Sequence, residues 1–506
     1  MGGGGRMIAI TLARAAAAVG APAPAEPDPR TVDVRRVVLD SRTAGPGDLF
    51  VALDGEHADG HDFVLAALAG GAAAAVVHDT SRWPGAGLPL LVVPDTLRAL
   101  GALAGAVVAS APDVTVVGIT GSNGKTTTKE MLAALLSTDA PTIATEGNLN
   151  NEIGVPLTAL RVEPQTRFLV TEMGARKVGD IEYLAGLVHP RVGVVLNVGT
   201  AHLGEFGSRA AIAQAKGELV EVLPADGIAV LNADDDLVMA MATRTGATIR
   251  TFGRAVRADV RAENVATDAH GRAGFDLVAG TGRARVQLGY VGEHHVSNAL
   301  AAAAVVLALK PGAAAADVAA VAAGLSRQAP VARWRMQVTD REDGVTIVND
   351  AYNSSPDSAA AAVRALVGIG RGRRTVAVLG EMLELGGAST AEHERLGRLA
   401  VDSGVDVILT VGAGASPIHD GALAQGAVAV LADRTHDPAT SAGNETRATK
   451  VADRDAAADA LRGLVRPGDV VLVKSSRDAG LRWLGDDLAA ASGDDGSAGD
   501  AQVTST

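Results

Sequence analysis

Short apolar runs, each followed by a polar or glycine-rich turn, recur along most of the chain. Runs of Val, Ile and Leu about four to eight residues long are typical of strands buried on both faces of a parallel sheet. Ala-rich stretches of helical length separate them, so the pattern predicts an α/β protein. The predicted strands cover residues 37–39, 49–53, 114–119, 168–170, 192–196, 227–231, 345–348, 375–379, 405–411, 427–431 and 470–473.

Three stretches depart from this alternation. Residues 259–292 combine strand-like runs with glycines and predict a β-rich segment, followed by a helix with His294 and Asn298 one turn apart. The Ala-rich start around Arg14 indicates an amphipathic helix and no signal sequence, with Met7 as a candidate start. The longest apolar run, residues 299–309, is too short for a membrane span of about 20 residues.

The length of 506 residues suggests about three domains. We expect a small α/β N-terminal module over residues 1–110, a central P-loop ATPase-like parallel sheet over 111–328 and a C-terminal Rossmann-like domain over 329–490. Residues 491–506 are rich in Gly, Ser, Asp and Thr and are expected to be disordered. The last domain lacks a Gly-x-Gly-x-x-Gly fingerprint, so bound NAD is not inferred.

Composition narrows the choice of ligands. The chain has no cysteine, which excludes disulfides and thiolate metal sites and agrees with a cytoplasmic location. Its formal net charge of −13 argues against nonspecific nucleic-acid binding, which needs broad basic surfaces. Anionic substrates would therefore require local basic pockets.

A phosphate-binding loop is predicted between the strand at 114–119 and the next helix. Two glycines allow successive N–H groups to converge on an anion, Lys125 can reach the β and γ phosphates, and Thr126 offers a hydroxyl to Mg²⁺. The loop is shorter than the common P-loop because residue 119 is Ile, and the alternative is an ordinary strand-to-helix turn. The predicted nucleotide contacts are Thr120, Gly121, Ser122, Asn123, Gly124, Lys125, Thr126 and Thr127.

Two further strands end in groups that bind metals. Glu172 follows the run at 168–170, and His202 lies in the loop after the run at 192–196. Ligands of open α/β sheets gather at the carboxyl ends of the strands, so both are candidate Mg²⁺ ligands. The alternatives are a helix-capping acid and a structural histidine. Lys216, on the following helix, has the features of a solvated lysine when its sequence is considered alone.

Other polar groups suit substrate binding. The loop at 145–156 contains three asparagines, Asn148, Asn150 and Asn151, which can orient a peptide or sugar phosphate or can be solvated. Ser41 and Arg42 can bind a base, sugar or phosphate, or form a surface turn. The segment from Lys474 to Arg477 predicts an anion pocket, with a basic turn as the alternative; both residues are candidate substrate contacts.

Five motifs occur in an order that resembles the Mur ligase family. They are residues 121–127 (Gly-Ser-Asn-Gly-Lys-Thr-Thr), 147–154 (Gly-Asn-Leu-Asn-Asn-Glu-Ile-Gly), 172–174 (Glu-Met-Gly), 197–202 (Asn-Val-Gly-Thr-Ala-His) and 215–217 (Ala-Lys-Gly). The asparagine loop and residues 349–356 most closely resemble members that add D-alanyl-D-alanine to UDP-N-acetylmuramoyl-tripeptide. The resemblance covers about residues 7–490. One departure is His295, where the family usually has asparagine.

The resemblance implies residue roles that the isolated motifs leave open. ATP and Mg²⁺ are the implied cofactors, with Thr126, Glu172 and His202 as metal ligands. Lys216 matches a lysine that is carbamylated and supports the second metal. The implied catalytic residues are Lys125, Glu172, His202, Lys216 and Arg335; Arg335, His294, Asn298 and Asp350 lie near ATP, with Tyr352 and Asn353 close by as substrate contacts.

The implied activity is an ADP-forming amide ligation through an acyl phosphate, in cytoplasmic peptidoglycan precursor synthesis. UDP-N-acetylmuramoyl-tripeptide and D-alanyl-D-alanine are the implied partners. The N-terminal module would hold the UDP end and the last domain would close over the site. No nucleic-acid partner and no membrane span are expected, and the chain is expected to act as a monomer.

Three alternatives remain. A ligase that adds the third residue to the UDP-muramoyl dipeptide commonly carries an Asp-Asn-Pro-Arg motif, which is absent from the C-terminal region. A folylpolyglutamate synthetase lacks an N-terminal module with the Asp-Ser-Arg and Asp-Gly-His pattern that this chain has at residues 40–42 and 59–61. A non-catalytic nucleotide switch would turn over ATP slowly and form no amide.

Overall fold

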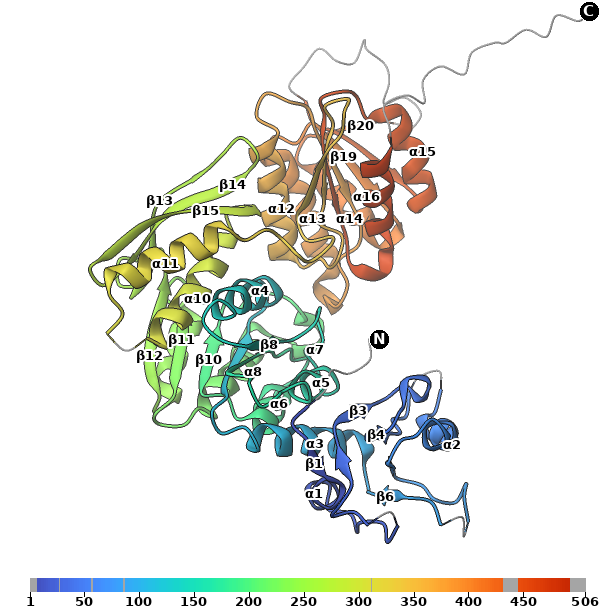
Figure 1. The fold of residues 1–506 in the computed structure, drawn as a ribbon. Helices are drawn as coiled ribbons and strands as arrows, with labels where there is room; N and C mark the ends of the chain where they lie inside the picture. The colour runs from blue at the N-terminus through green and yellow to red at the C-terminus, as the bar shows by residue number, and fades with distance from the viewer. Residues whose placement is uncertain are drawn as a thin grey trace, which may run out of the picture.

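The computed structural model describes residues 7–26, 28–55, 58–84, 87–310, 312–430 and 445–491. Three α/β units follow one another along the chain, with the N-terminal unit at one end and the C-terminal unit at the other (Figure 1). The three-domain α/β fold predicted from the sequence is therefore confirmed. The predicted disordered tail lies outside the described residues from residue 492 onward. Within the described ranges, no helix is long and apolar enough to cross a bilayer.

The N-terminal unit is built on a four-stranded parallel sheet in the order β3-β4-β5-β6. Its strands are β3 (Arg36–Val38), β4 (Asp48–Val51), β5 (Ala74–Val77) and β6 (Leu90–Val92). A short antiparallel pair, β1 (Ile10–Thr11) and β2 (Asp33–Val34), lies beside helix α1 (Leu12–Ala18). Helix α2 (Val64–Ala69) completes the unit, and α3 (Thr96–Ala109) leads out of it.

Helix α3 joins the N-terminal unit to the central one through a shared core. It packs against the central helices α5 (Gly154–Ala159) and α6 (Asp180–Val188). One hydrophobic cluster runs from Leu12 and Leu49 through Leu103 to Leu169 and Leu184. Because this interface is apolar and continuous with both cores, it fixes the N-terminal unit against the central one.

The central unit contains a nine-stranded sheet in the order β15-β14-β13-β12-β11-β10-β7-β9-β8. Strands from β8 to β13 are parallel, whereas β13, β14 and β15 pair antiparallel. The sheet is therefore mixed, because the β-rich segment predicted at 259–292 extends its edge. The strands are β7 (Thr115–Thr120), β8 (Thr142–Ala144), β9 (Phe168–Glu172), β10 (Val192–Val195), β11 (Ile228–Asn232), β12 (Thr248–Gly253), β13 (Val260–Thr267), β14 (Arg272–Ala279) and β15 (Gly282–Val291).

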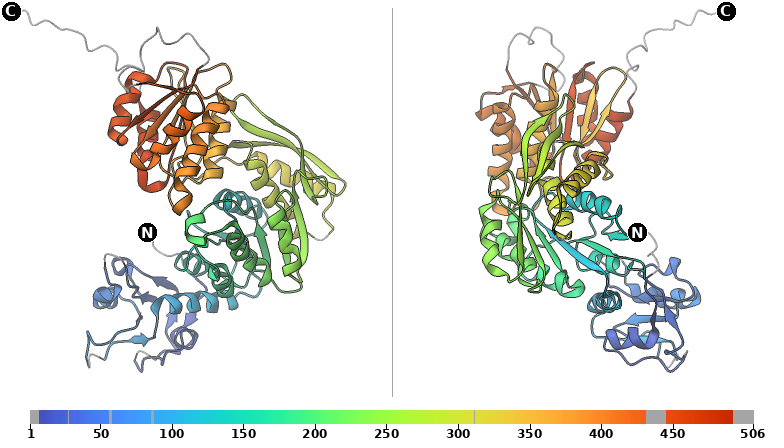
Figure 2. Two further views of the ribbon diagram at one scale, coloured as in Figure 1. Left: turned by 180° about the vertical axis from the view of Figure 1, so that it is seen from behind. Right: turned by 60° about the vertical axis from the view of Figure 1, so that its left-hand side comes forward.

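Helices cover both faces of this sheet, as seen in the two views of Figure 2. Helix α10 (His295–Ala308) packs against α4 (Lys125–Leu136), β11 and β12, and its central turns are almost wholly buried. Helix α8 (Arg209–Glu221) packs against α6, β7 and β10. The other central helices are α7 (Leu203–Phe206), α9 (Asp236–Met239) and α11 (Ala315–Ser326).

The C-terminal unit has a seven-stranded sheet in the order β16-β17-β22-β18-β19-β21-β20, parallel except for β16. The strands are β16 (Gln337–Asp340), β17 (Thr346–Asn349), β18 (Thr375–Leu379), β19 (Val407–Val411), β20 (Val428–Ala429), β21 (Arg447–Val451) and β22 (Val470–Lys474). Its helices are α12 (Pro356–Ile369), α13 (Ser389–Asp402), α14 (Ser416–Ala424), α15 (Arg454–Leu464) and α16 (Leu481–Ala490).

In the C-terminal unit one predicted strand was mostly wrong, and two strands, β16 and β21, were not predicted. Of the strand predicted at 427–431, only the two exposed residues of β20 form one among the described residues, and residue 431 lies outside them. Strand β21 was not predicted, because its sequence Arg-Ala-Thr-Lys-Val has no continuous apolar run. Both predicted domain boundaries fall in connecting segments, after α3 and after α11, and they stay predictions.

Candidate active site

The predicted phosphate loop connects the end of β7 to the start of α4. Gly124 has a φ of +84°, a left-handed conformation that glycine adopts without steric cost. A Cβ at Gly124 would overlap the side-chain oxygen of Asn298, and a Cβ at Gly121 would lie 2.8 Å from Cβ of Leu196. The two glycines therefore allow the loop to turn tightly against α10 and the end of β10.

Lys125 begins α4 and folds back over the loop. Its Nζ donates to the carbonyl of Gly121 at 2.7 Å, and burial lowers its pKa. Thr120, Thr126 and Thr127 are buried around it, and Thr120 Oγ1 has no hydrogen-bond partner among the described residues. The loop thus presents an amine, hydroxyls and a helix N-terminus, the chemistry that a nucleotide phosphate requires.

Asn197, after β10, holds the loop from the neighbouring strand. Its Oδ1 accepts from the backbone N–H of Asn123 at 2.9 Å, and its Nδ2 donates to the carbonyl of Asn123 at 3.1 Å. Ser122 Oγ accepts from the N–H of Gly199 at 2.9 Å. The ends of β7 and β10 are therefore one rigid unit. Asn197 belongs to the motif at residues 197–202, and no role was predicted for it.

Glu172 ends β9 directly beside this loop, as predicted. Its side chain is only 1% exposed, accepts from Thr126 Oγ1 at 2.9 Å and accepts from Asn150 Nδ2 at 2.7 Å. Its backbone N–H donates to Thr145 Oγ1 at 3.0 Å. A buried carboxylate next to a hydroxyl and an amide provides hard oxygen donors, which fit Mg²⁺.

Lys216, on α8, is buried at 4% exposure. Among the described residues, no hydrogen bond or ion pair to its amine is recorded. Burial, assisted by the nearby charge of Lys125, lowers its pKa well below the ordinary value of a lysine. The interpretation of Lys216 as a solvated helix residue is wrong. Burial of this kind favours the uncharged amine of a lysine, which is the nucleophilic form.

His202 faces the C-terminal unit in this structure. Its Nδ1 lies 2.7 Å from Oε2 of Glu384, and the backbone N–H of Gly204 donates to the carbonyl of Glu384 at 3.1 Å. Both His202 and Glu384 adopt positive φ, +60° and +65°. Within the described ranges, the group of possible metal ligands around His202 is completed by Glu205 and Glu384 and does not include Glu172. His202 and Glu172 therefore do not share one ligand group in this domain arrangement, and their roles as Mg²⁺ ligands stay predictions.

Two further contacts bring the C-terminal unit to the same sheet edge. Ser355 Oγ donates to Oδ1 of Asn123 at 3.0 Å. The N–H and Oγ1 of Thr200 donate to Oδ2 of Asp357 at 3.0 and 3.2 Å. The segment that follows β17 therefore lies against the phosphate loop.

Arg335 enters the site from the strand connection before β16. Its guanidinium carbon lies 4.3 Å from the centre of the Tyr352 ring, a cation–π contact. Its charge contributes to lowering the pKa of both Lys125 and His295. The guanidinium therefore lies near the phosphate loop, and contact of Arg335 with ATP stays a prediction.

Asp350 and Lys474 form an internal ion pair next to Arg335. Lys474 is 3% exposed; its Nζ lies 2.7 Å from Asp350 Oδ2 and donates to the carbonyl of Asn353 at 2.7 Å. Asp350 Oδ1 accepts from the N–H of Met336 at 3.0 Å. Arg477 is exposed on the short helix after β22. The anion pocket predicted at 474–477 stays a prediction, since its lysine is paired within the domain here.

The remaining predicted contacts lie around these groups. His294 caps α10, one turn before Asn298, and Asn298 Nδ2 lies 3.2 Å from Nδ1 of His295. Asn148 and Asn151 are exposed, and Asn151 Oδ1 accepts from the N–H of Gly154 at 3.0 Å. Only Asn150 of the three asparagines turns inward, to Glu172.

Ser41 and Arg42 lie on a 3₁₀ turn (Ser41–Thr43) of the N-terminal unit. Arg42 is exposed and pairs with Asp40 at 2.6 Å, and its hydrogen bonds lower the pKa of Asp40 to about 2. Ser41 is partly exposed, and the substrate role of both residues stays a prediction.

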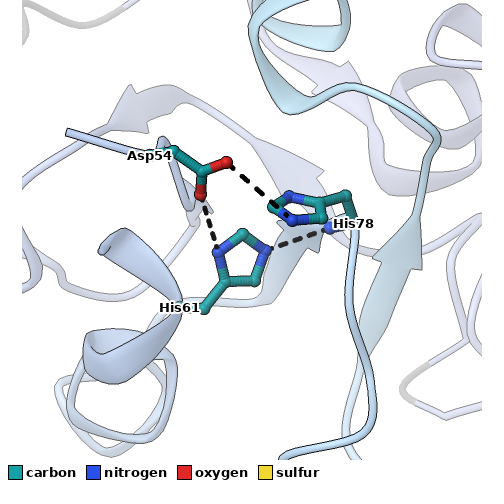
Figure 3. A group of neighbouring side chains, drawn as sticks. All are labelled: Asp54, His61 and His78. Carbon is teal, nitrogen blue, oxygen red and sulfur yellow. Dashed lines mark hydrogen bonds and ion pairs between the residues drawn. The ribbon is translucent and has the colours of Figure 1, made fainter.

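A second group of potential metal ligands lies in the N-terminal unit, at Asp54, His61 and His78 (Figure 3). His61 is buried; its Nδ1 lies 2.7 Å from Asp59 Oδ1 and its Nε2 accepts from the N–H of His78 at 3.1 Å. Because both ring nitrogens are used within the fold, His61 braces two loops and has no lone pair left for a metal.

Comparison with known proteins identifies the same three units. Family models match residues 33–108 (Mur ligase family, catalytic domain), 119–306 (Mur ligase middle domain) and 334–477 (Mur ligase, glutamate ligase domain). The UDP-N-acetylmuramoyl-tripeptide–D-alanyl-D-alanine ligase of Mycobacterium tuberculosis is 45% identical over 96% of this chain and 98% of its own. The Escherichia coli ligase of that name is 41% identical over 74% of this chain and 81% of its own.

Solved structures agree with this result. MurF from Acinetobacter baumannii is 32% identical, covers 96% of this chain and 99% of its own, and superposes with a TM-score of 0.83. MurF from Thermotoga maritima, solved in complex with ADP, is 31% identical, covers 89% of this chain and 96% of its own, and gives a TM-score of 0.74.

Proposed function

The chain belongs to the Mur ligase family, and from this we propose that it joins D-alanyl-D-alanine to UDP-N-acetylmuramoyl-tripeptide with ATP in peptidoglycan precursor synthesis. The family predicted from the motifs is confirmed. The observation that carries the proposal is that a phosphate-loop lysine, a buried carboxylate and a second buried lysine, Lys216, lie close together at one edge of the sheet. Simple nucleotide binding does not require the last of these.

ATP phosphates would lie on the loop at the start of α4. The amine of Lys125, now bonded to its own loop, would exchange that carbonyl for phosphate oxygens. Arg335, held over Tyr352, would approach the same phosphates from the C-terminal unit. Positive groups on both sides of the transferred phosphoryl group stabilise the charge that spreads over its oxygens.

Thr126, Glu172, His202 and a carbamylated Lys216 are the groups that would hold Mg²⁺. The buried oxygen donors around Glu172 support this assignment. When bound, Mg²⁺ supplies charge neutralisation for the phosphates. His202 would have to leave Glu384 to join this set, so we infer a change in the position of the C-terminal unit during the cycle.

The environment of Lys216 supports carbamate formation. A neutral amine attacks the carbon of CO₂, an N–C bond forms, and one proton is released to solvent. The product carries a carboxylate-like negative charge where the lysine would have carried a positive one. Its position near Lys125 favours that change of sign, because a cation is repelled there and an anion is attracted.

The ligation proceeds in two displacements. A carboxylate oxygen of the tripeptide attacks the γ-phosphorus of ATP, the bond to ADP breaks, and an acyl phosphate forms. The amine of D-alanyl-D-alanine then attacks the acyl carbon, phosphate leaves, and the amine loses a proton. Because little covalent help is needed from the protein, positioning by residues such as Lys125 and Arg335 carries most of the catalysis.

The remaining predicted residues would hold the UDP and peptide parts of the substrate, away from the ATP phosphates. Ser41 and Arg42 are proposed to hold the UDP end, and Asn148, Asn150 and Asn151 the peptide. Tyr352, Asn353, Lys474 and Arg477 are proposed on the C-terminal side, with Asp350, His294 and Asn298 near the nucleotide. Since every proposed group comes from one chain, we propose a monomer, acting in the cytoplasm where UDP-linked precursors and ATP are available.

The purified protein tests this directly. The protein is incubated with ATP, Mg²⁺ and UDP-muramoyl-tripeptide. When D-alanyl-D-alanine is added, we expect released phosphate and the ligated product, detected by its mass, to increase in equal amounts. Parallel reactions offer UDP-muramoyl-dipeptide with a free diamino acid, or a folate with glutamate. Product only in one of those reactions would favour the corresponding alternative ligase, and ATP turnover without any amide would favour a nucleotide switch.

A further inference from the structure

Arg335 stands in a backbone segment that is strained on both sides. Trp334 has a φ of +60° and Met336 a φ of +49°, and neither residue is a glycine. Non-glycine residues keep such conformations only when the surrounding structure holds them there. Two left-handed residues therefore flank Arg335, whose guanidinium stacks on Tyr352, and contacts with neighbouring elements must hold this segment.

The side chain of Trp334 is held by Asp486 of α16. Its indole Nε1–H lies 3.0 and 2.9 Å from the two carboxylate oxygens of Asp486. Asn349 Nδ2 also donates to Asp486, at 3.2 Å, and Arg333 Nη2 donates at 2.9 Å. A Cβ at Gly485 would overlap the amide of Asn349, so this glycine allows the close approach.

The backbone of Trp334 connects this contact with Asp486 to the residues around Arg335. The carbonyl of Trp334 accepts from the N–H of Tyr352 at 3.1 Å, and the Tyr352 ring carries the Arg335 guanidinium 4.3 Å from its centre. On the other side, the N–H of Met336 donates to Asp350 at 3.0 Å. Trp334 therefore links Asp486 to the strained turn and to Tyr352, the stacking partner of Arg335.

We propose that Asp486 is a positioning residue for Arg335, acting through the Trp334 indole; this rests on the proposed function, in which Arg335 contacts ATP phosphates. Asp486 lies on α16, outside the groups assigned to ATP, Mg²⁺ or substrate. Its oxygens accept from three side-chain donors, Trp334, Asn349 and Arg333, so its role is to hold the segment, not to bind substrate.

Asp486→Asn tests this with little change in size. An asparagine has one acceptor oxygen, and its NH₂ group would face the donors of Trp334, Asn349 or Arg333. We expect kcat for the ligation to fall about tenfold, since a small misplacement of a catalytic group costs rate steeply, while the KM for UDP-muramoyl-tripeptide stays within about twofold. Asp487→Asn, at the exposed neighbour on the same helix, is the matched control and should leave kcat unchanged.

The decisive comparison repeats Asp486→Asn in an Arg335→Lys background. If Asp486 acts through Arg335, the second substitution changes kcat by less than about twofold, because lysine has no planar fork left to position. A general loss of folding would instead lower kcat by the same factor in both backgrounds. Trp334→Phe, which removes the indole N–H and keeps an aromatic ring, should reproduce the fall seen in Asp486→Asn.

Two results would overturn the inference. One is a kcat of Asp486→Asn within about twofold of wild type. The other is an equal fall in the wild-type and Arg335→Lys backgrounds. If Asp486→Asn does not unfold cooperatively, Trp334→Phe decides by the same criteria. Wild-type protein without amide product would refute the proposed function and this inference with it, whereas wild-type ligation with unaffected variants would refute the positioning role alone.

Discussion

Replacing Lys216 by methionine tests whether the buried amine is neutral in the folded protein. The lysine is 4% exposed and has no recorded hydrogen bond or ion pair among the described residues, and Lys125 is the charged group that acts on it. Methionine is similar in length and carries no charge. The substitution therefore removes the cost of a desolvated amine while keeping most of the packing.

The sign of the effect follows from proton binding. The pKa of Lys216 is lowered in the folded protein, so between that pKa and about 10.4 the unfolded chain holds a proton that the folded one lacks. The penalty is complete below the folded pKa and disappears as pH rises to the unfolded pKa. Within this window, Lys216 makes the free energy of unfolding rise by about 1.4 kcal/mol per pH unit. Lys216→Met abolishes that contribution.

Thermal unfolding in CO₂-free buffer at pH 8.5 and 9.5 measures the difference. The wild-type melting temperature should rise relative to that of Lys216→Met by about 3–6 °C over this unit, taking a central domain of about 200 residues. Lys177→Met, at an exposed lysine, should keep the wild-type dependence. Bicarbonate should stabilise wild type but not Lys216→Met, because only the amine forms a carbamate. Parallel pH curves for wild type and Lys216→Met would refute a neutral Lys216.

The remaining predictions concern the groups around Glu172 and His202. Asn150→Ala removes a donor 2.7 Å from the buried Glu172 carboxylate, so we expect a loss of about 1.5–3 kcal/mol in unfolding free energy and a higher Mg²⁺ requirement in the ligation assay. Asn148→Ala, at an exposed site, should change the unfolding free energy by less than about 0.5 kcal/mol and leave the Mg²⁺ requirement unchanged. Equal behaviour of the two variants would contradict the hydrogen bond assigned between Asn150 and Glu172. Glu384→Gln weakens a partly exposed ion pair with His202 by about 0.5–1 kcal/mol. In a titration with ADP and Mg²⁺ followed by small-angle scattering, the radius of gyration of the variant should therefore fall at lower ligand concentration than that of wild type. Identical titrations of variant and wild type would show that the pair does not hold the present arrangement.

Continuous apolar runs predicted most of the parallel strands, because residues buried on both faces leave a plain signal. Strand β18 was predicted with its observed bounds, and all five of its residues are buried. Strand β21 was not predicted because its sequence, Arg-Ala-Thr-Lys-Val, contains no continuous apolar run. Strands without such a run of Val, Ile and Leu were missed even inside a sheet, as at β5 (Ala74–Val77) and β12 (Thr248–Gly253).

Local sequence predicted some residues of the candidate site and not others. Loop chemistry and strand-end position were enough to find Lys125 and Glu172, because both depend on local sequence. The pairing of His202 with Glu384 depends on how two domains are arranged, which no local pattern records. Acidic residues after β18 were the available signal for Glu384. The burial of Lys216 comes from the packing of α8 on the sheet, and only the family resemblance pointed to its role.

Transfer of oxygen from substrate to phosphate tests the central claim most directly. The protein is given ATP, Mg²⁺, D-alanyl-D-alanine and UDP-muramoyl-tripeptide in which both oxygens of the acceptor carboxylate are ¹⁸O. If the carboxylate takes the phosphoryl group and the amine displaces it, each released phosphate contains one ¹⁸O and appears together with one amide product. Unlabelled phosphate, released by water without an amide product, would contradict the assignment of this chain as a ligase.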